Sequence, residues 1–153
     1  MKTGIIVYSQ TGHTKQAAER LLQALKSSGQ DAELLGVKVS NPAPEKQLTQ
    51  LHFVNAPVVD AYDRLVFASP VWAFSLAGVM KAYLAGMPPL TGKKISLFVT
   101  HQLPFPWMGG NASIRQMRSL CEDKGGEIVS HAVISWGKKQ RERDLSDMVR
   151  KLA

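Results

Sequence analysis

A short loop near the start of the sequence gathers hydroxyl groups around a glycine. Ser9, Thr11 and Thr14 flank Gly12, directly after the apolar run at 4–8. A helical pattern follows at once, so unpaired backbone N–H groups and the positive end of a helix dipole should favour an anion there. Gly12 would let a ligand approach the backbone closely. We predict a phosphate site; the alternative is an ordinary helix N-cap, for which one hydroxyl is enough.

The sequence lacks the other common phosphate motifs. Neither a Gly-x4-Gly-Lys-Ser/Thr P-loop nor a Gly-x-Gly-x-x-Gly fingerprint follows the first strand pattern. The loop has no cysteine, which excludes a cysteine phosphatase built on it, and the strand ends lack the clustered aspartates of a receiver domain.

Two later loops, after the strand patterns at 65–68 and 94–100, are rich in aromatic residues and proline. A flat aromatic ligand would cover such side chains, and stacking contributes about 0.5–1.5 kcal/mol beyond the buried area. For any one of these aromatics, packing at the edge of the sheet is the alternative. Four of them beside a phosphate loop favour a ligand site. The loop residues of interest are Pro70, Val71, Trp72, Ala73 and Phe74, then His101, Gln102, Phe105, Trp107, Gly109 and Gly110.

Strand and helix patterns alternate along the chain. The strand patterns are apolar without strict alternation, which is typical of parallel strands covered by helices on both faces. Right-handed crossovers favour a doubly wound α/β sheet, and we expect one domain over 1–153. Ligands bind such sheets beyond the carboxyl ends of the strands, where the three loops lie. The strand patterns are 4–8, 32–39, 65–68, 94–100 and 128–134, and the helix patterns are 13–27, 75–85, 111–124 and 140–152, with a short helix at most near 45–51.

Together the three loops resemble those of the flavodoxin family. Ser9–Thr14 is similar to its FMN phosphate loop, Ser/Thr-x-Thr-Gly-x-Thr, while Ser69–Phe74 and His101–Gly110 look like its second and third flavin loops. The resemblance implies an α/β/α sandwich of three layers, with a five-stranded parallel sheet in the order 2-1-3-4-5 and non-covalent FMN. It also implies that groups around the flavin tune its potentials.

The resemblance further assigns residues to the cofactor. Isoalloxazine contacts are implied for the two aromatic loops, through the residues at 70–74 and through His101, Gln102, Phe105, Trp107, Gly109 and Gly110. Phosphate-loop contacts are implied for Ser9, Gln10, Thr11, Gly12, His13 and Thr14.

The charge separates this chain from electron-shuttle flavodoxins, which are characteristically acidic. Its formal net charge is +7, and 61–153 hold thirteen basic and seven acidic residues. Ser-Pro-Val-Trp followed by Ala-Gly-Val-Met-Lys-Ala-Tyr-Leu is similar to the NAD(P)H-dependent FMN and quinone reductases of this fold. We therefore expect an FMN oxidoreductase that takes hydride from NAD(P)H and reduces a quinone or similar acceptor. A one-electron carrier and a non-enzymatic module without flavin are the alternatives.

Three isolated residues complete the candidates. His101 is the candidate catalytic residue, as a donor to a reduced quinone, with a structural loop histidine as the alternative. His13 could donate to phosphate or face solvent. Cys121 reads as a buried apolar residue, and no histidine has metal-ligand spacing, so no metal is expected.

The remaining expectations concern partners and location. The basic run at 138–143 reads as a solvated helix face, because nucleic-acid binding would add exposed aromatics or a known motif. No apolar run is long enough to span a membrane, and no signal peptide is recognisable. The single cysteine suggests a reducing, cytoplasmic compartment. The expected partner is a small-molecule electron acceptor or a redox protein, and a homodimer is left open.

Overall fold

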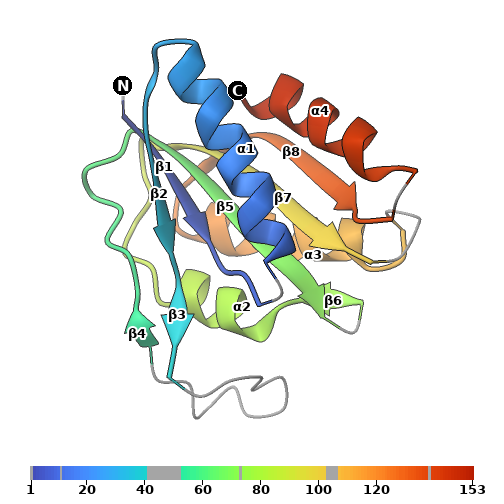
Figure 1. Ribbon diagram of the computed structural model, residues 1–153. Coiled ribbons are helices and arrows are strands. Elements are labelled where there is room, and N and C mark those ends of the chain that lie inside the picture. Colours follow the sequence, from blue (N-terminus) through green and yellow to red (C-terminus); the bar gives the residue numbers. More distant parts are fainter. Residues whose placement is uncertain (1, 11, 41–52, 73, 103–106, 138) are drawn as a thin grey trace.

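The computed structural model describes residues 2–10, 12–40, 53–72, 74–102, 107–137 and 139–153. Its centre is a twisted sheet of five parallel strands in the order β2-β1-β5-β7-β8 (Figure 1). Numbered among themselves along the chain, these five strands have the order 2-1-3-4-5, so the predicted topology is confirmed. The strands are β1 (Lys2–Val7), β2 (Asp31–Gly36), β5 (Arg64–Trp72), β7 (Lys94–His101) and β8 (Glu127–Ser135).

Helices cover both faces of this sheet and complete the three predicted layers (Figure 1). On one face α1 (His13–Ser27) and α4 (Arg141–Leu152) pack over a cluster that includes Ile5 and Phe98. On the other face α2 (Gly78–Ala85) and α3 (Gly110–Asp123) pack over a cluster that includes Phe67, Leu97 and the buried Cys121. Among the described residues, no helix combines the length and apolarity needed to cross a bilayer.

The strand patterns differ as their places in the sheet require. The central strands β1, β5 and β7 are buried over most of their length, whereas the edge strand β8 alternates along its first half. Strands covered on both faces need apolar side chains on both, which is why the central ones read as continuous apolar runs.

Three predicted elements have the wrong extent. The strand predicted at 65–68 continues to Trp72 as β5, so Pro70, Val71 and Trp72, predicted in a loop, belong to the end of that strand. The predicted strand at 32–39 is split: Val37 lies between β2 and β3 (Lys38–Val39), which pairs with β4 (Phe53–Asn55) in a separate two-stranded sheet. The helix predicted from Ser75 begins at Gly78, because β6 (Ser75–Leu76) folds back antiparallel onto the end of β5. The short helix considered near 45–51 lies outside the described residues.

Candidate functional site

The three predicted loops meet at the edge where β1, β5 and β7 end. There they border a hollow of about 110 Å³, which we call the central cleft. Parallel strands bring their carboxyl ends to one edge, so segments far apart in sequence become neighbours. Its lining residues are Gln10, His13, Pro70, Val71, Trp72, Thr100, His101 and Gln102.

The first loop presents backbone N–H groups to one point. Gly12 has φ +95°, in the left-handed region, and comes directly before α1. The Ser9 Oγ accepts hydrogen bonds from the N–H groups of Gly12 (3.2 Å) and Lys15 (3.3 Å). The N–H groups of the first helical turn have no intrahelical acceptor, and this turn carries no acidic side chain. The loop therefore suits an anion, with the Ser9 hydroxyl marking where an acceptor oxygen sits.

Thr14 is the predicted phosphate contact that the structure places farthest from solvent. It is 1% exposed, and its hydroxyl lies 2.7 Å from the Thr100 hydroxyl. This pair joins the start of α1 to the end of β7 and fixes the loop over the sheet. Thr11 lies outside the described residues.

Replacing one member of this hydroxyl pair should destabilise the protein more than replacing both. Thr14→Val alone leaves the buried Thr100 hydroxyl without its partner, which costs about 1–3 kcal/mol. Thr14→Val with Thr100→Val removes both polar groups and should cost less than either single change. Urea unfolding of the four proteins measures the coupling, and strictly additive losses would contradict the pairing.

His13 connects the first loop to two other strand ends. Gln102 Nε2 donates to His13 Nδ1 at 2.9 Å. The imidazole also stacks on Trp136, with 4.6 Å between ring centroids and 16° between planes, and the Arg141 guanidinium lies 5.4 Å from the Trp136 ring centre. Trp136 directly follows β8 and was not among the residues predicted for the site. Its position, an aromatic residue at the carboxyl end of the fifth strand pattern, was the signal that could have identified it.

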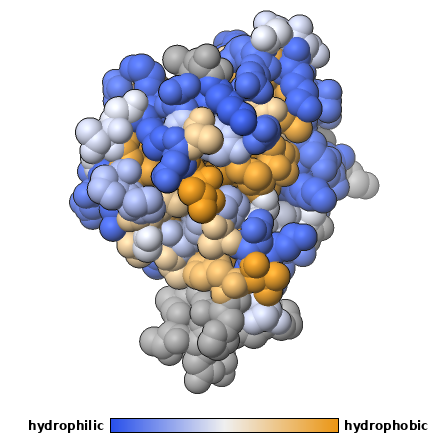
Figure 2. Space-filling model, turned by 90° about the vertical axis from the view of Figure 1, so that its left-hand side faces the viewer, coloured by the Kyte–Doolittle hydropathy of each residue, from blue (hydrophilic) through white to orange (hydrophobic). Residues whose placement is uncertain are grey.

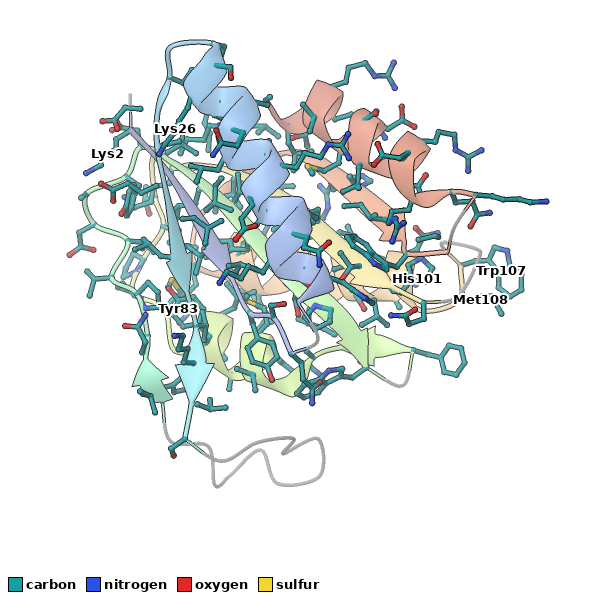
Figure 3. The ribbon with its side chains drawn as sticks, viewed as in Figure 1. Lys2, Lys26, Tyr83, His101, Trp107 and Met108 are labelled. Carbon is teal, nitrogen blue, oxygen red and sulfur yellow. The ribbon has the colours of Figure 1, made fainter. Side chains whose placement is uncertain are left out.

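The aromatic residues of the second and third loops divide into two groups. Trp72 lines the cleft, and its ring meets Tyr8 edge-on with 5.7 Å between centroids. Phe74 and Trp107 are 62% and 71% exposed and do not line the central cleft. Figure 3 shows Trp107 at the outer end of this edge. Ala73 and Phe105 lie outside the described residues.

Gly109 and Gly110 permit close approach of backbone segments. Gly109 has φ +103°, and a Cβ built on it would lie 2.6 Å from Phe74 Cα. A Cβ on Gly110 would lie 2.6 Å from Val133 Cγ1. These contacts hold the start of α3 against the loop after β5 and against β8, so the glycines set the shape of the edge.

His101 is a buried polar residue at the cleft, only 6% exposed. Its Nε2 lies 3.1 Å from Ser135 Oγ, and the Ser135 N–H donates to Asp144 Oδ2 at 2.9 Å. Burial lowers the pKa of His101, and the Asp144 charge partly opposes that. This is not a hydrolase triad, since the carboxylate bonds the serine backbone rather than His101 and Ser135 is itself buried.

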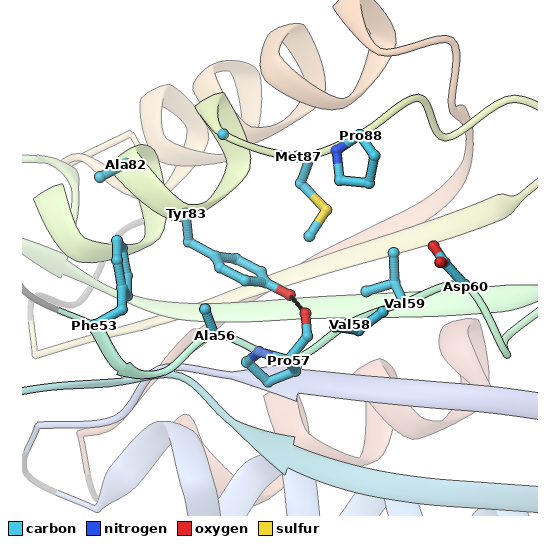
Figure 4. Close-up of a pocket in the computed structure, with 11 residues that line it drawn as sticks. Phe53, Ala56, Pro57, Val58, Val59, Asp60, Ala82, Tyr83, Met87 and Pro88 are labelled. Atoms are coloured by element: carbon cyan, nitrogen blue, oxygen red, sulfur yellow. Dashed lines mark hydrogen bonds between the residues drawn. The ribbon is translucent and has the colours of Figure 1, made fainter.

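A larger hollow, of about 390 Å³, lies elsewhere, between the segment around β4 and the end of α2 (Figure 4). Its lining is mostly apolar, including Phe53 and Met87, and Asp60 is the one charged residue among the described residues that line it. Tyr83 projects across it and donates to the Pro57 carbonyl, and burial raises the pKa of Tyr83. Its lining includes none of the predicted site residues that the structure describes.

Apolar surface also accompanies this hollow. Phe53, Val54 and Val58 are exposed beside it. Figure 2 views the side of the molecule that carries β2 and β4, where hydrophobic residues gather among hydrophilic ones.

No protein-family model matches the sequence, and neither does any curated protein. Solved structures do match over almost the whole chain. A flavoprotein in complex with FMN from Lactobacillus acidophilus NCFM is 21% identical, with a TM-score of 0.65 and 99% of each chain covered. The flavodoxin of Megasphaera elsdenii is 19% identical, with a TM-score of 0.67 and coverage of 97% of this chain and 98% of that one. A WrbA-like flavodoxin from Agrobacterium tumefaciens is 16% identical, with a TM-score of 0.67 and coverage of 97% and 90%.

These similarities agree with the strand order, the two pairs of covering helices and the loops at the carboxyl edge. At sequence identities this low, structural similarity shows that the folds agree and nothing more. The chain therefore has the flavodoxin-like fold.

Proposed function

We propose that residues 1–153 form one domain that binds FMN at the central cleft and reduces a quinone or similar acceptor with hydride from NAD(P)H. One observation carries this proposal. The N–H groups at the start of α1 and a cleft walled by Trp72 and Pro70 lie side by side, at the carboxyl ends of the strands. A phosphate and a flat ring joined by a short chain would fit that pairing.

The phosphate end of FMN fits the described residues well. Ser9 Oγ already collects two backbone N–H groups, as a phosphate oxygen would, and Gly12 leaves open space where another residue would have a Cβ. Hydrogen bonds from N–H groups to an anion are stronger than those between neutral groups. Ser9, Gln10, Gly12 and His13 are the described residues that would hold this group. Thr14, also predicted, would contribute through its backbone N–H, because its hydroxyl is paired with that of Thr100.

The ring end fits the chemistry of the cleft, which offers an apolar wall and amide or imidazole groups. The described part, about 110 Å³, is smaller than the roughly 300–1,000 Å³ of typical small-molecule sites. Residues 11, 73 and 103–106 belong to the same loops and are not among those described. Their predicted contacts, including those of Thr11, Ala73 and Phe105, stay predictions. That a protein of this fold is described in complex with FMN supports the assignment.

When bound, FMN supplies the capacity to accept hydride and pass its electrons on. The chain's own residues would then bind FMN and orient it. The first loop would fix the phosphate, Trp72 would cover one side of the ring, and the Gln102–His13 hydrogen bond would join the two loops that flank it. The edge-on contact with Tyr8 holds Trp72 in place. Trp72 would then exclude water from the side of the flavin ring that it covers.

The basic charge supports a phosphorylated hydride donor. The net charge is +7, and ion pairs on the outer helices, such as Arg20–Glu142 and Arg150–Asp147, leave that excess unchanged. A cationic protein attracts anionic ligands at low and moderate ionic strength. Both NADH and NADPH are anionic, so the donor is proposed as NAD(P)H.

A one-electron carrier is the second candidate, and the flavodoxins among proteins of similar fold favour it. Stepwise anaerobic reduction separates the two. A carrier should accumulate one-electron-reduced flavin, whereas a hydride-transfer enzyme should pass directly to the two-electron-reduced form.

To test the proposed function, the FMN-loaded protein is mixed with NADPH or NADH and a soluble quinone, and the nicotinamide absorbance is followed. We expect the nicotinamide absorbance to fall only when protein and quinone are both present. FMN binding without nicotinamide oxidation would contradict the reductase and favour the carrier. Failure to bind FMN would contradict both.

A further inference from the structure

His101 has one partnered and one unpartnered ring nitrogen, although it is more than nine-tenths buried. Its Nε2 lies beside the Ser135 hydroxyl, 3.1 Å away. Its Nδ1 is shielded from solvent and has no hydrogen-bond partner among the described residues. Buried polar atoms nearly always have a hydrogen-bond partner, so an unpartnered one is unusual. At the edge of a ligand cleft, such an atom suggests a functional role.

The pairing indicates which nitrogen carries the proton in the neutral ring. A buried N–H without an acceptor costs about 1–3 kcal/mol. A proton on Nε2 can be donated to Ser135, whereas a proton on Nδ1 would have no acceptor among the residues that the structure describes. Neutral His101 therefore holds its proton on Nε2, and Nδ1 offers a lone pair.

The position of His101 on β7 decides which side chains surround it. Its backbone neighbours Thr100 and Gln102 also line the central cleft. Alternation along β7 places its side chain on the face opposite Thr100, toward α3. The residues that α3 buries there are uncharged: Gly110, Ser113, Ile114, Met117 and Cys121, whose thiol stays neutral because burial raises its pKa to about 12.

The charged and titratable groups nearby come from the other elements. Asp144 of α4 is largely buried and lies one hydrogen bond beyond Ser135, with Arg143 Nε 3.6 Å from its Oδ1. The end of β5 at 70–72 brings no charge. The other charged and titratable groups on these elements are His13, Lys15, Glu19, Arg20 and Lys26 of α1, Arg115, Arg118, Glu122 and Asp123 of α3, Glu127 and His131 of β8, and Arg141, Glu142, Asp147, Arg150 and Lys151 of α4.

We propose that His101 Nδ1 takes up a proton from solvent when the ring bound in the central cleft gains two electrons and becomes negatively charged; this inference rests on the proposed function. An external reductant gives the ring two electrons and solvent gives it one proton, which leaves one negative charge. A second proton binds Nδ1, and no bond forms between His101 and the ring. The imidazolium keeps its Nε2 hydrogen bond to Ser135, and the negative charge of Asp144 favours it.

The direction of the pH dependence follows from the charges. Burial lowers the pKa of His101 below its ordinary value. A new negative charge nearby favours the protonated ring and raises that pKa. The pKa of His101 before reduction and its pKa after reduction bound a window of pH. Within this window, reduction leads His101 to take up a proton.

The experiment measures proton uptake during anaerobic reduction of the FMN-loaded protein by dithionite, at a series of pH values from acidic to mildly basic. The variant is His101→Gln, and His131→Gln is the matched control, because His131 is exposed on β8 and does not line the cleft. Within the window, wild type and His131→Gln should take up as much as about one proton more per two electrons than His101→Gln.

Equal uptake by His101→Gln and wild type would overturn the inference and leave the proposed function standing. Failure of wild type to bind FMN would overturn both. A second measurement needs no variant: nitrogen NMR of labelled histidines in the wild-type protein. The His101 Nδ1 signal should change from unprotonated to protonated on reduction within the window, and an unchanged Nδ1 signal in both states would overturn the inference.

Discussion

Gly109→Ala is expected to lower the free energy of unfolding by about 2–6 kcal/mol. A residue with a side chain at φ +103° is strained by about 1–3 kcal/mol. The new Cβ would also meet the backbone of Phe74 at 2.6 Å, where no flexible side chain can move aside, and overpacking costs about a further 1–3 kcal/mol. Because this contact joins α3 to the loop after β5, FMN affinity should fall as well. Urea unfolding and FMN titration measure the two effects.

Gly92→Ala is the matched control for that change. Gly92 has φ +83°, but nothing lies within 4 Å of the Cβ position, so only the backbone strain remains. Its loss should be about 1–2 kcal/mol, with FMN affinity unchanged. Equal losses for the two variants would show that the close approach of residues 74 and 109 is not what makes Gly109 necessary.

Trp136→Ala should cost about 3–5 kcal/mol of stability and weaken FMN binding. Trp136 is 9% exposed, and removal of a buried tryptophan leaves a large cavity. Its ring is also the surface on which His13 stacks and over which Arg141 lies. Without it, His13 loses one of the two contacts that fix it beside the central cleft, the other being Gln102.

Trp136→Phe keeps an aromatic surface and should lose less than half as much stability. For FMN, the comparison of interest is Trp136→Ala against Trp136→Ala with His13→Ala. If His13 transmits the effect, the second change should add little to the loss of affinity. A loss of stability below about 1 kcal/mol for Trp136→Ala would contradict the buried stack, given the usual cost of such a truncation.

The sequence predicted the elements that carry strong local patterns. The periodic spacing of Ala17, Ala18, Leu21 and Leu25 predicted α1 with its observed bounds. It did not predict β6, because Ser75 and Leu76 are compatible with a helix and pair with β5 through a turn in which Phe74 has φ +65°. A bulky residue in that conformation gives no signal in sequence.

The site was predicted at the level of loops rather than of individual contacts. Strand patterns and the rule for carboxyl ends were enough to bring Gln10, Trp72 and His101 together at one cleft. The partnership of Thr14 with Thr100 spans 86 positions and depends on how α1 packs over β7, which no local pattern reports.

The central claim is that the start of α1 holds the phosphate of FMN, and the affinities of FMN and riboflavin test it most directly. Riboflavin lacks only the phosphate, so two or three lost charge-assisted hydrogen bonds should weaken its binding by about a hundredfold. Two variants at Gly12 sharpen the test, because Asp and Asn tolerate positive φ and the Cβ position is open. Gly12→Asn should keep most of the preference, whereas Gly12→Asp should abolish it by placing a negative charge beside the phosphate. Equal binding of FMN and riboflavin by the wild-type protein would contradict the account.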